Sequence, residues 1–147
     1  MYTGRENEGG SFVRWRLSTA DDAPPPTLDS YIAAWMERDQ LRAELVEWMS
    51  DTPILICPVG ATPAYPHDTL KVEVNGTTMG TFRAFSYSQA FNVFDLPVVT
   101  IQAGKSKDGL PIGVQIVGRP FEEAKVLKVA EAVSDMSGSE NMDSRFR

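Results

Sequence analysis

The chain has 147 residues, of which 42% are hydrophobic and 23% charged, which fits one ordinary globular domain and argues against intrinsic disorder. It carries 20 acidic and 14 basic residues, so its formal net charge of -6 provides no basic field to attract nucleic acid or an anionic membrane surface. Having one cysteine and one histidine, the chain can form neither an intrachain disulfide nor a zinc site built from those residue types alone.

The cellular location of the protein and the order of its two ends can be predicted from the distribution of polar and apolar residues. No apolar stretch approaches the roughly 18 residues that a membrane helix needs, and residues 1–12 lack the apolar core of a secretory signal peptide. We therefore expect a cytosolic protein, and no motif calls for a cofactor or a metal ion. Residues 1–26 are polar and end in three prolines, which predicts a flexible arm or linker, and residues 137–147 predict a disordered tail.

Residues 27–50 predict the first helix. Apolar side chains recur there at helical spacing, charged ones lie mostly off that stripe, and Thr27 or Asp29 can cap the start. The stripe consists of Tyr31, Ala34, Trp35, Leu41, Leu45 and Trp48.

A strand and a hairpin are predicted next. Residues 54–57 are apolar and closed by Pro58, the pattern of a strand buried on both faces. Residues 60–66 contain one glycine and two prolines, which indicates a loop. Residues 71–74 then alternate polar and apolar side chains before Asn75 and Gly76, which predicts a small exposed hairpin.

The rest of the chain predicts a helix, two strands and a last helix. Residues 81–94 fit a largely buried helix, and the runs 97–103 and 111–117 are rich in β-formers and joined by a turn. Acidic residues open the last helix after Arg119 and Pro120. We expect the strands at 54–57, 97–103 and 111–117 to share one sheet.

The sequence contains no motif that indicates a catalytic activity by itself. Gly104 to Ser106 ends like a phosphate loop but lacks the required first glycine, and no serine stands in a nucleophile elbow. Cys57 and His67 could form a thiolate and its base, but an apolar run around Cys57 favours simple packing. Five lysines are expected to be solvated side chains: Lys71, Lys105, Lys107, Lys125 and Lys128.

A family resemblance rests on several features in the right order. An apolar strand ends at Pro58, Asn92 precedes the Leu96-Pro97 strand start, and residues 109–118 read GLPIGVQIVG before a final helix. Together, residues 27–133 resemble the C-terminal part of the amidase signature family. The resemblance implies an α/β fold, with residues 27–136 forming a partial amidase domain that has a mixed sheet and flanking helices.

The resemblance also implies an activity and a partner. Members of that family hydrolyse carboxamides with a Ser-Ser-Lys triad carried by a Gly/Ser-rich segment, which this sequence does not show, so no catalytic residue is assigned. A small-molecule amide would then be bound only within a complete enzyme, whose N-terminal portion is the expected partner. Unpaired sheet edges predict self-association of the chain alone.

Four residues are expected near the acyl pocket because the family brings the corresponding segments there: Val59, Phe85, Ser88 and Asn92. An aromatic Phe85 points to an apolar substrate group, since a charged group would need a paired charge; ordinary core packing explains it equally well. Asn92 and Gln115 are interpreted as structural residues that satisfy buried polar groups.

Three hypotheses stay open at this point. The chain is a C-terminal amidase portion, or a non-catalytic accessory module that docks onto another chain, or a small α/β protein without a deducible activity. A neighbouring reading frame with the Gly/Ser-rich segment would favour the first hypothesis.

Overall fold

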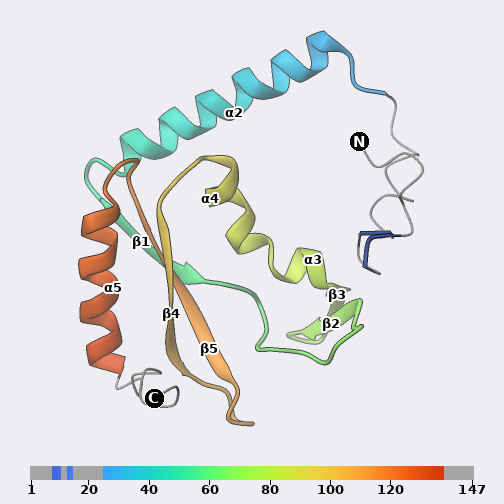
Figure 1. Cartoon of the computed structure of the whole chain (residues 1–147), viewed down its shortest axis with the longest axis vertical. Coiled ribbons are helices and arrows are strands. Elements are labelled where there is room, and N and C mark those ends of the chain that lie inside the picture. Colours follow the sequence, from blue (N-terminus) through green and yellow to red (C-terminus); the bar gives the residue numbers. More distant parts are fainter. Residues whose placement is uncertain (1–7, 11–12, 15–24, 138–147) are drawn as a thin grey trace. The chain divides into compact units, whose positions relative to one another are not determined.

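The computed structural model describes residues 8–10, 13–14 and 25–137 (Figure 1). The predicted arm at 1–26 lies mostly outside these residues, and the predicted tail at 137–147 almost entirely so. The chain divides into two units, Met1–Glu37 and Arg38–Arg147, and the boundary falls inside helix α2 (Leu28–Trp48). Most of the described structure belongs to the second unit.

Helix α2 begins where the sequence predicted. The Thr27 Oγ1 accepts the N–H of Ser30 at 3.1 Å, and the Ser30 Oγ accepts the N–H of Thr27 at 2.9 Å, which caps the helix reciprocally. Within the first unit, Tyr31 and Trp35 make an edge-to-face ring contact at 6.2 Å. The helix has no buried residue, and most of its predicted apolar stripe, including Leu41 and Trp48, is exposed.

The three predicted β-runs share one sheet, as expected. Strands β1 (Ile54–Pro58), β5 (Pro111–Gly118) and β4 (Val98–Lys105) lie in that order, and both pairs are antiparallel. Ile116 of β5 stands opposite Ile56 on one side and Val99 on the other. Because side chains alternate along a strand, these residues share one face of the sheet.

Helix α5 (Glu123–Ser137) packs on that face, over β4 and β5 (Figure 1). Its Val126 and Ala130 form a core with Ile116, which is completely buried. The opposite face forms a second core in which Val117 packs with Met49 and Leu96. Partly buried residues from the second half of α2, from β1, from α4 and the residue after it, and from β4 complete that second core: Leu45, Val46, Leu55, Cys57, Phe91, Phe94 and Val98.

Two arginines join the second half of α2 to the end of the α4 segment. The Nε of Arg38 donates to the carbonyl of Val93 at 2.7 Å, and the Nε of Arg42 donates to the carbonyl of Phe94 at 2.8 Å. Arg38 also pairs with Asp95. These bonds satisfy carbonyls that a helix end leaves without partners.

The predicted hairpin is confirmed. Strands β2 (Lys71–Val74) and β3 (Thr77–Gly80) pair in antiparallel fashion around Asn75 and Gly76. Both turn residues have positive φ, at 49° and 76°, the conformation that a tight two-residue turn requires.

The single buried helix predicted for residues 81–94 is wrong. The structure contains three short pieces instead: α3 (Thr81–Ala84), the 3₁₀ turn η2 (Ser86–Ser88) and α4 (Gln89–Val93). Two side chains bond to carbonyls of the interrupted backbone: the Ser88 Oγ donates to the carbonyl of Phe85 at 3.0 Å, and the Gln89 Nε2 donates to that of Phe82 at 3.1 Å. Thr81 and Ala84 are the buried residues of these pieces, while Phe82 is exposed.

The described helices include none that is both long and apolar enough to cross a lipid bilayer.

We predict that Gly118→Ala destabilises the fold. A Cβ at Gly118 would collide with the Cγ2 of buried Val126, whereas a Cβ at Gly104 in β4 meets no atom within 4 Å. Overpacking of this kind costs about 1–3 kcal/mol. Urea unfolding should therefore show a lower free energy of unfolding for Gly118→Ala and little change for the control Gly104→Ala. Equal effects of both substitutions would contradict the packing of α5 on β5.

Candidate functional site

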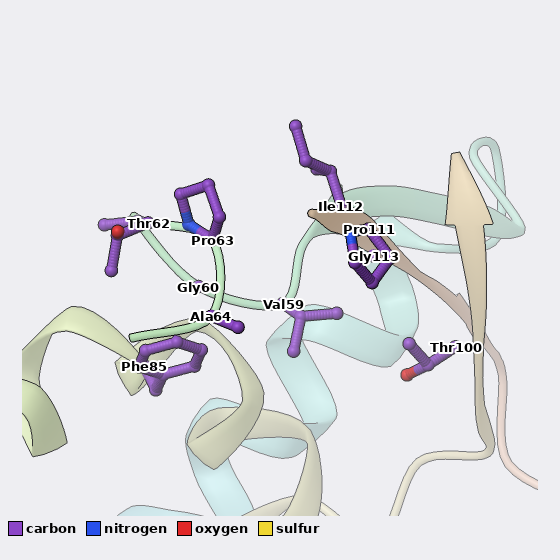
Figure 2. A pocket seen from close by; sticks show the side chains of 11 residues that line it. Val59, Gly60, Thr62, Pro63, Ala64, Phe85, Thr100, Pro111, Ile112 and Gly113 are labelled. Carbon is purple, nitrogen blue, oxygen red and sulfur yellow. The ribbon is translucent and has the colours of Figure 1, made fainter. Parts of the chain in front are cut away.

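A cavity of about 430 Å³ lies past the end of β1, between the segment that follows β1 and the start of β5 (Figure 2). Phe85, from the turn after α3, forms another wall, and Thr100 of β4 contributes to the side near the sheet. The lining comprises Val59, Gly60, Ala61, Thr62, Pro63, Ala64, Phe85, Thr100, Pro111, Ile112 and Gly113. None of these residues is charged, so the cavity suits an uncharged, largely apolar group.

The segment from Val59 to Ala64 is held in place by hydrogen bonds at its start. The Val59 N–H donates to the carbonyl of Gly113 at 3.4 Å, and the Ala61 N–H donates to that of Ala84 at 2.8 Å. The first bond ties this segment to β5, and the second ties it to α3. The wall of the cavity is therefore fixed by two elements that are distant in sequence.

Gln115 provides a further support from inside the sheet. Its side chain is 2% exposed, and its Nε2 donates to the carbonyl of Pro58 at 2.8 Å, just before the cavity wall begins. Its strand partners are Cys57 on β1 and Thr100 on β4. The three side chains thus lie in one row across the same face of the sheet, and the Thr100 end of that row reaches the cavity.

Phe85 owes its position to a glycine and a tyrosine. A Cβ built on Gly60 would lie 2.5 Å from the Cδ1 of Phe85, so the ring packs against bare backbone at that point. The ring of Tyr65 lies 5.6 Å away, centroid to centroid, on a tilted plane. Only glycine at position 60 leaves the ring this room.

The four residues predicted to lie near the acyl pocket are found in two settings. Val59 and Phe85 line the cavity, whereas Ser88 and Asn92 do not. The Asn92 Nδ2 donates to the carbonyl of Ser88 at 3.2 Å, and the Ser88 Oγ donates to that of Phe85. Both polar residues therefore bond within the segment that carries Phe85.

Sequence reasoning missed most of the cavity wall. The resemblance places the loop after the first strand near the pocket but names only Val59 there, and the sequence pattern assigns Thr100 and Ile112 to strands without placing them at the pocket. The glycine and prolines of that loop were the available signal, because they restrict the backbone next to a strand end.

Cys57 has the surroundings of a packed thiol. Burial raises the pKa of its thiol above the ordinary value, which disfavours the nucleophilic thiolate. The Gln115 Nε2 lies 3.8 Å from its sulfur, and no hydrogen bond of the described residues joins Cys57 to His67. The five lysines predicted to be solvated are all exposed. No group of three or more His, Cys, Asp or Glu that could hold a metal ion occurs in the described part of the chain.

Comparison with known proteins shows which family the sequence matches. The sequence profile of the family described as amidase matches residues 2–127. The chain is 35% identical over 131 residues to a fatty acid amide hydrolase of Arabidopsis thaliana. The matched region covers 86% of this chain and 20% of that protein. It is 34% identical over 103 residues to a glutamyl-tRNA(Gln) amidotransferase subunit of Neisseria meningitidis, covering 70% of this chain and 21% of that protein.

Solved structures agree with the sequence matches. A crystal structure of an amidase superposes with a TM-score of 0.78 at 28% identity, over 92% of this chain and 30% of that one. The α/β fold class predicted from the sequence is thereby confirmed. The chain spans only about a fifth of the length of the curated relatives named above.

We predict that Cys57 alkylates slowly in the folded protein. Because its pKa is raised, less thiolate is present at any pH below that value, and iodoacetamide reacts with the thiolate. At about pH 8, near the ordinary range of cysteine titration, the rate should be lower in the folded chain than in the urea-unfolded chain. The pH midpoint of the rate should also be higher. A midpoint below that of the unfolded chain would identify Cys57 as an activated thiol instead.

Proposed function

The chain belongs to the amidase family, and from this membership we propose that it forms the C-terminal part of an enzyme that hydrolyses carboxamide C–N bonds. In this proposal the Ser-Ser-Lys groups come from a segment that the 147 residues do not contain. The coverage supports it, because the amidase profile matches residues 2–127 while the chain spans a fifth of the Arabidopsis relative.

The observation that carries the proposal furthest is the uncharged cavity lined by Val59 and Phe85. We assign to it the apolar part of an amide substrate, because burying apolar surface there contributes about 25 cal/mol per Å². A charged substrate group would find no opposite charge in the lining. Val59 and Phe85 would contact the substrate, and Ser88 and Asn92 would hold the segment that carries Phe85. The name of the Arabidopsis relative, a fatty acid amide hydrolase, favours the same kind of substrate.

In this proposal the present chain binds the apolar part of the substrate, and a segment outside the 147 residues supplies the catalytic groups. Amide hydrolysis needs an activated nucleophile and a base within hydrogen-bond reach of it. Cys57 has a raised pKa and an amide neighbour, and the lysines are exposed and none of them is among the residues that line the cavity. The described residues thus supply a binding surface and leave bond cleavage to the proposed partner segment.

A non-catalytic binding module remains the second candidate, since no charged residue, cysteine or histidine lines the cavity. The two candidates differ in whether the cavity serves a reaction. The cytosolic location also stays a prediction.

We predict that the purified 147-residue chain does not hydrolyse amides or esters above background. Release of p-nitroaniline from acyl p-nitroanilides measures this directly, with the Arabidopsis relative as the positive control. Activity that persists through purification and disappears in Cys57→Ala would contradict the proposal and assign chemistry to Cys57. Activity that persists in Cys57→Ala would contradict it equally, because a further nucleophile would then be present.

We predict that a chimera restores activity and reports on the cavity. In it, this chain replaces the matching segment of the Arabidopsis relative, which supplies the catalytic groups. Phe85→Asp should lower kcat/KM for apolar acyl amides about 100-fold or more, because an unpaired carboxylate in the cavity costs several kcal/mol. Small polar amides should be affected less.

The matched control is Phe121→Asp, the same change at a side chain that is 92% exposed, and Lys105→Ala at the exposed end of β4 is a second control. Both should leave kcat/KM nearly unchanged. If Phe85→Asp behaves like these controls in a folded chimera, the cavity does not bind the substrate, and the binding-module hypothesis gains.

A further inference from the structure

Gln115 is a buried amide in the otherwise apolar strand β5. It shares a face of that strand with Val117, which is completely buried in the core that contains Met49. An amide in such a place costs free energy unless it is hydrogen-bonded, whereas an apolar side chain of similar size would not. Its Nε2 lies 2.8 Å from the carbonyl oxygen of Pro58 and 3.8 Å from the sulfur of Cys57. The bond to Pro58 is therefore the one that compensates the buried amide.

This bond holds the chain at the point where it leaves the sheet. Pro58 is the last residue of β1, and the next main-chain bond to β5, from the Val59 N–H to the carbonyl of Gly113, is 3.4 Å long. Bonds between an N–H and a carbonyl are ordinarily about 2.7–3.2 Å long, so the side-chain bond from Gln115 is the stronger of the two attachments. The path of the backbone after β1 therefore depends mainly on Gln115.

The backbone that Gln115 holds is in close contact with the Phe85 ring (Figure 2). The ring lies where a Cβ of Gly60 would stand, and it also contacts the ring of Tyr65. On the other side of Gly60, the Ala61 N–H is held by its 2.8 Å bond to the carbonyl of Ala84. In a closely packed wall, a displacement of the Gly60 backbone must move the Phe85 ring or open a gap beside it.

We propose that Gln115 is a positioning residue that sets the shape of the cavity wall at Gly60 and Phe85, and thereby the apolar acyl groups that the cavity accepts. Gln115 is not among the residues that line the cavity, so it acts through its bond to Pro58. The inference rests on the proposed function, because it concerns the selection of substrates by the same cavity. Acyl groups large enough to fill the cavity depend on Gln115, whereas an acetyl group, which leaves most of the 430 Å³ empty, does not.

The kinetics of the chimera with the Arabidopsis relative test this inference. Gln115→Met keeps the length of the side chain and removes the N–H donor, so the Pro58 carbonyl loses this bond. For hexanoyl p-nitroanilide we expect KM to rise about 10-fold, the effect of losing one hydrogen bond that holds the binding wall. The kcat should stay nearly unchanged, because the catalytic groups lie elsewhere. For acetyl p-nitroanilide both constants should stay nearly unchanged.

The matched control is Val117→Ala, on the same strand and the same face of the sheet. It removes buried apolar atoms and lowers stability, and it leaves the bond from Gln115 to Pro58 in place. If Gln115 served stability alone, both variants would lower the fraction of folded enzyme, and the apparent kcat would fall equally for both substrates with KM unchanged. That result would overturn the inference and leave the proposed function standing. A KM that rises equally for both substrates, or that rises equally in Val117→Ala, would overturn it as well.

If the chimera is inactive, the proposed function is contradicted, and binding to the isolated 147-residue chain decides the inference. Hexanamide is titrated into the chain, and the NMR shifts of the Val59 and Ala61 amides give its Kd, with acetamide as the small comparison. We expect Gln115→Met to weaken hexanamide binding about 10-fold and Val117→Ala to leave it nearly unchanged. Equal Kd values for all three proteins, or no binding to any of them, would overturn the inference.

Discussion

The placement of β5 between two strands and two apolar layers is the constraint on which the rest of the structure depends. Ile116 and Val117 are adjacent in sequence, and both are completely buried, one under α5 and the other against Met49 and Leu96. A strand with period-two alternation can serve two cores only when both of its faces are covered. The same strand carries Gly113 and Gln115, which anchor the segment that lines the cavity.

The wall of the cavity is therefore positioned by hydrogen bonds to strand β5 of the sheet. Gln115 satisfies the carbonyl of Pro58 from a buried position, and a buried amide without partners would be costly. The backbone of Val59 to Ala64 leaves the sheet at this point and passes over Phe85, whose ring occupies the space that a side chain at Gly60 would need. The uncharged lining and the backbone bonds of Val59 and Ala61 together define the wall of the cavity.

Prediction from the sequence succeeded where local chemistry and tertiary packing agree. The three β-runs, the hairpin at Asn75 and Gly76 and the helix that starts after Thr27 all appear near their predicted bounds. It failed at residues 81–94, where Ser88 and Gln89 bond to backbone carbonyls and divide the helix, a competition that apolar spacing does not reveal. Two of the four candidate site residues line the cavity; the other two bond within the segment of Phe85.

The sequence by itself determined the α/β class, the order of the elements and the family, because periodicity, turn residues and the residue pattern near Pro58, Asn92 and Gly109 are local properties of the chain. Only the tertiary structure decided which residues surround the cavity and which elements cover the two faces of β5. Both depend on contacts between segments distant in sequence, such as the bonds from Val59 to Gly113 and from Ala61 to Ala84. A spacing rule reports which face of an element a residue occupies, and the element that will cover that face is fixed only when the chain packs.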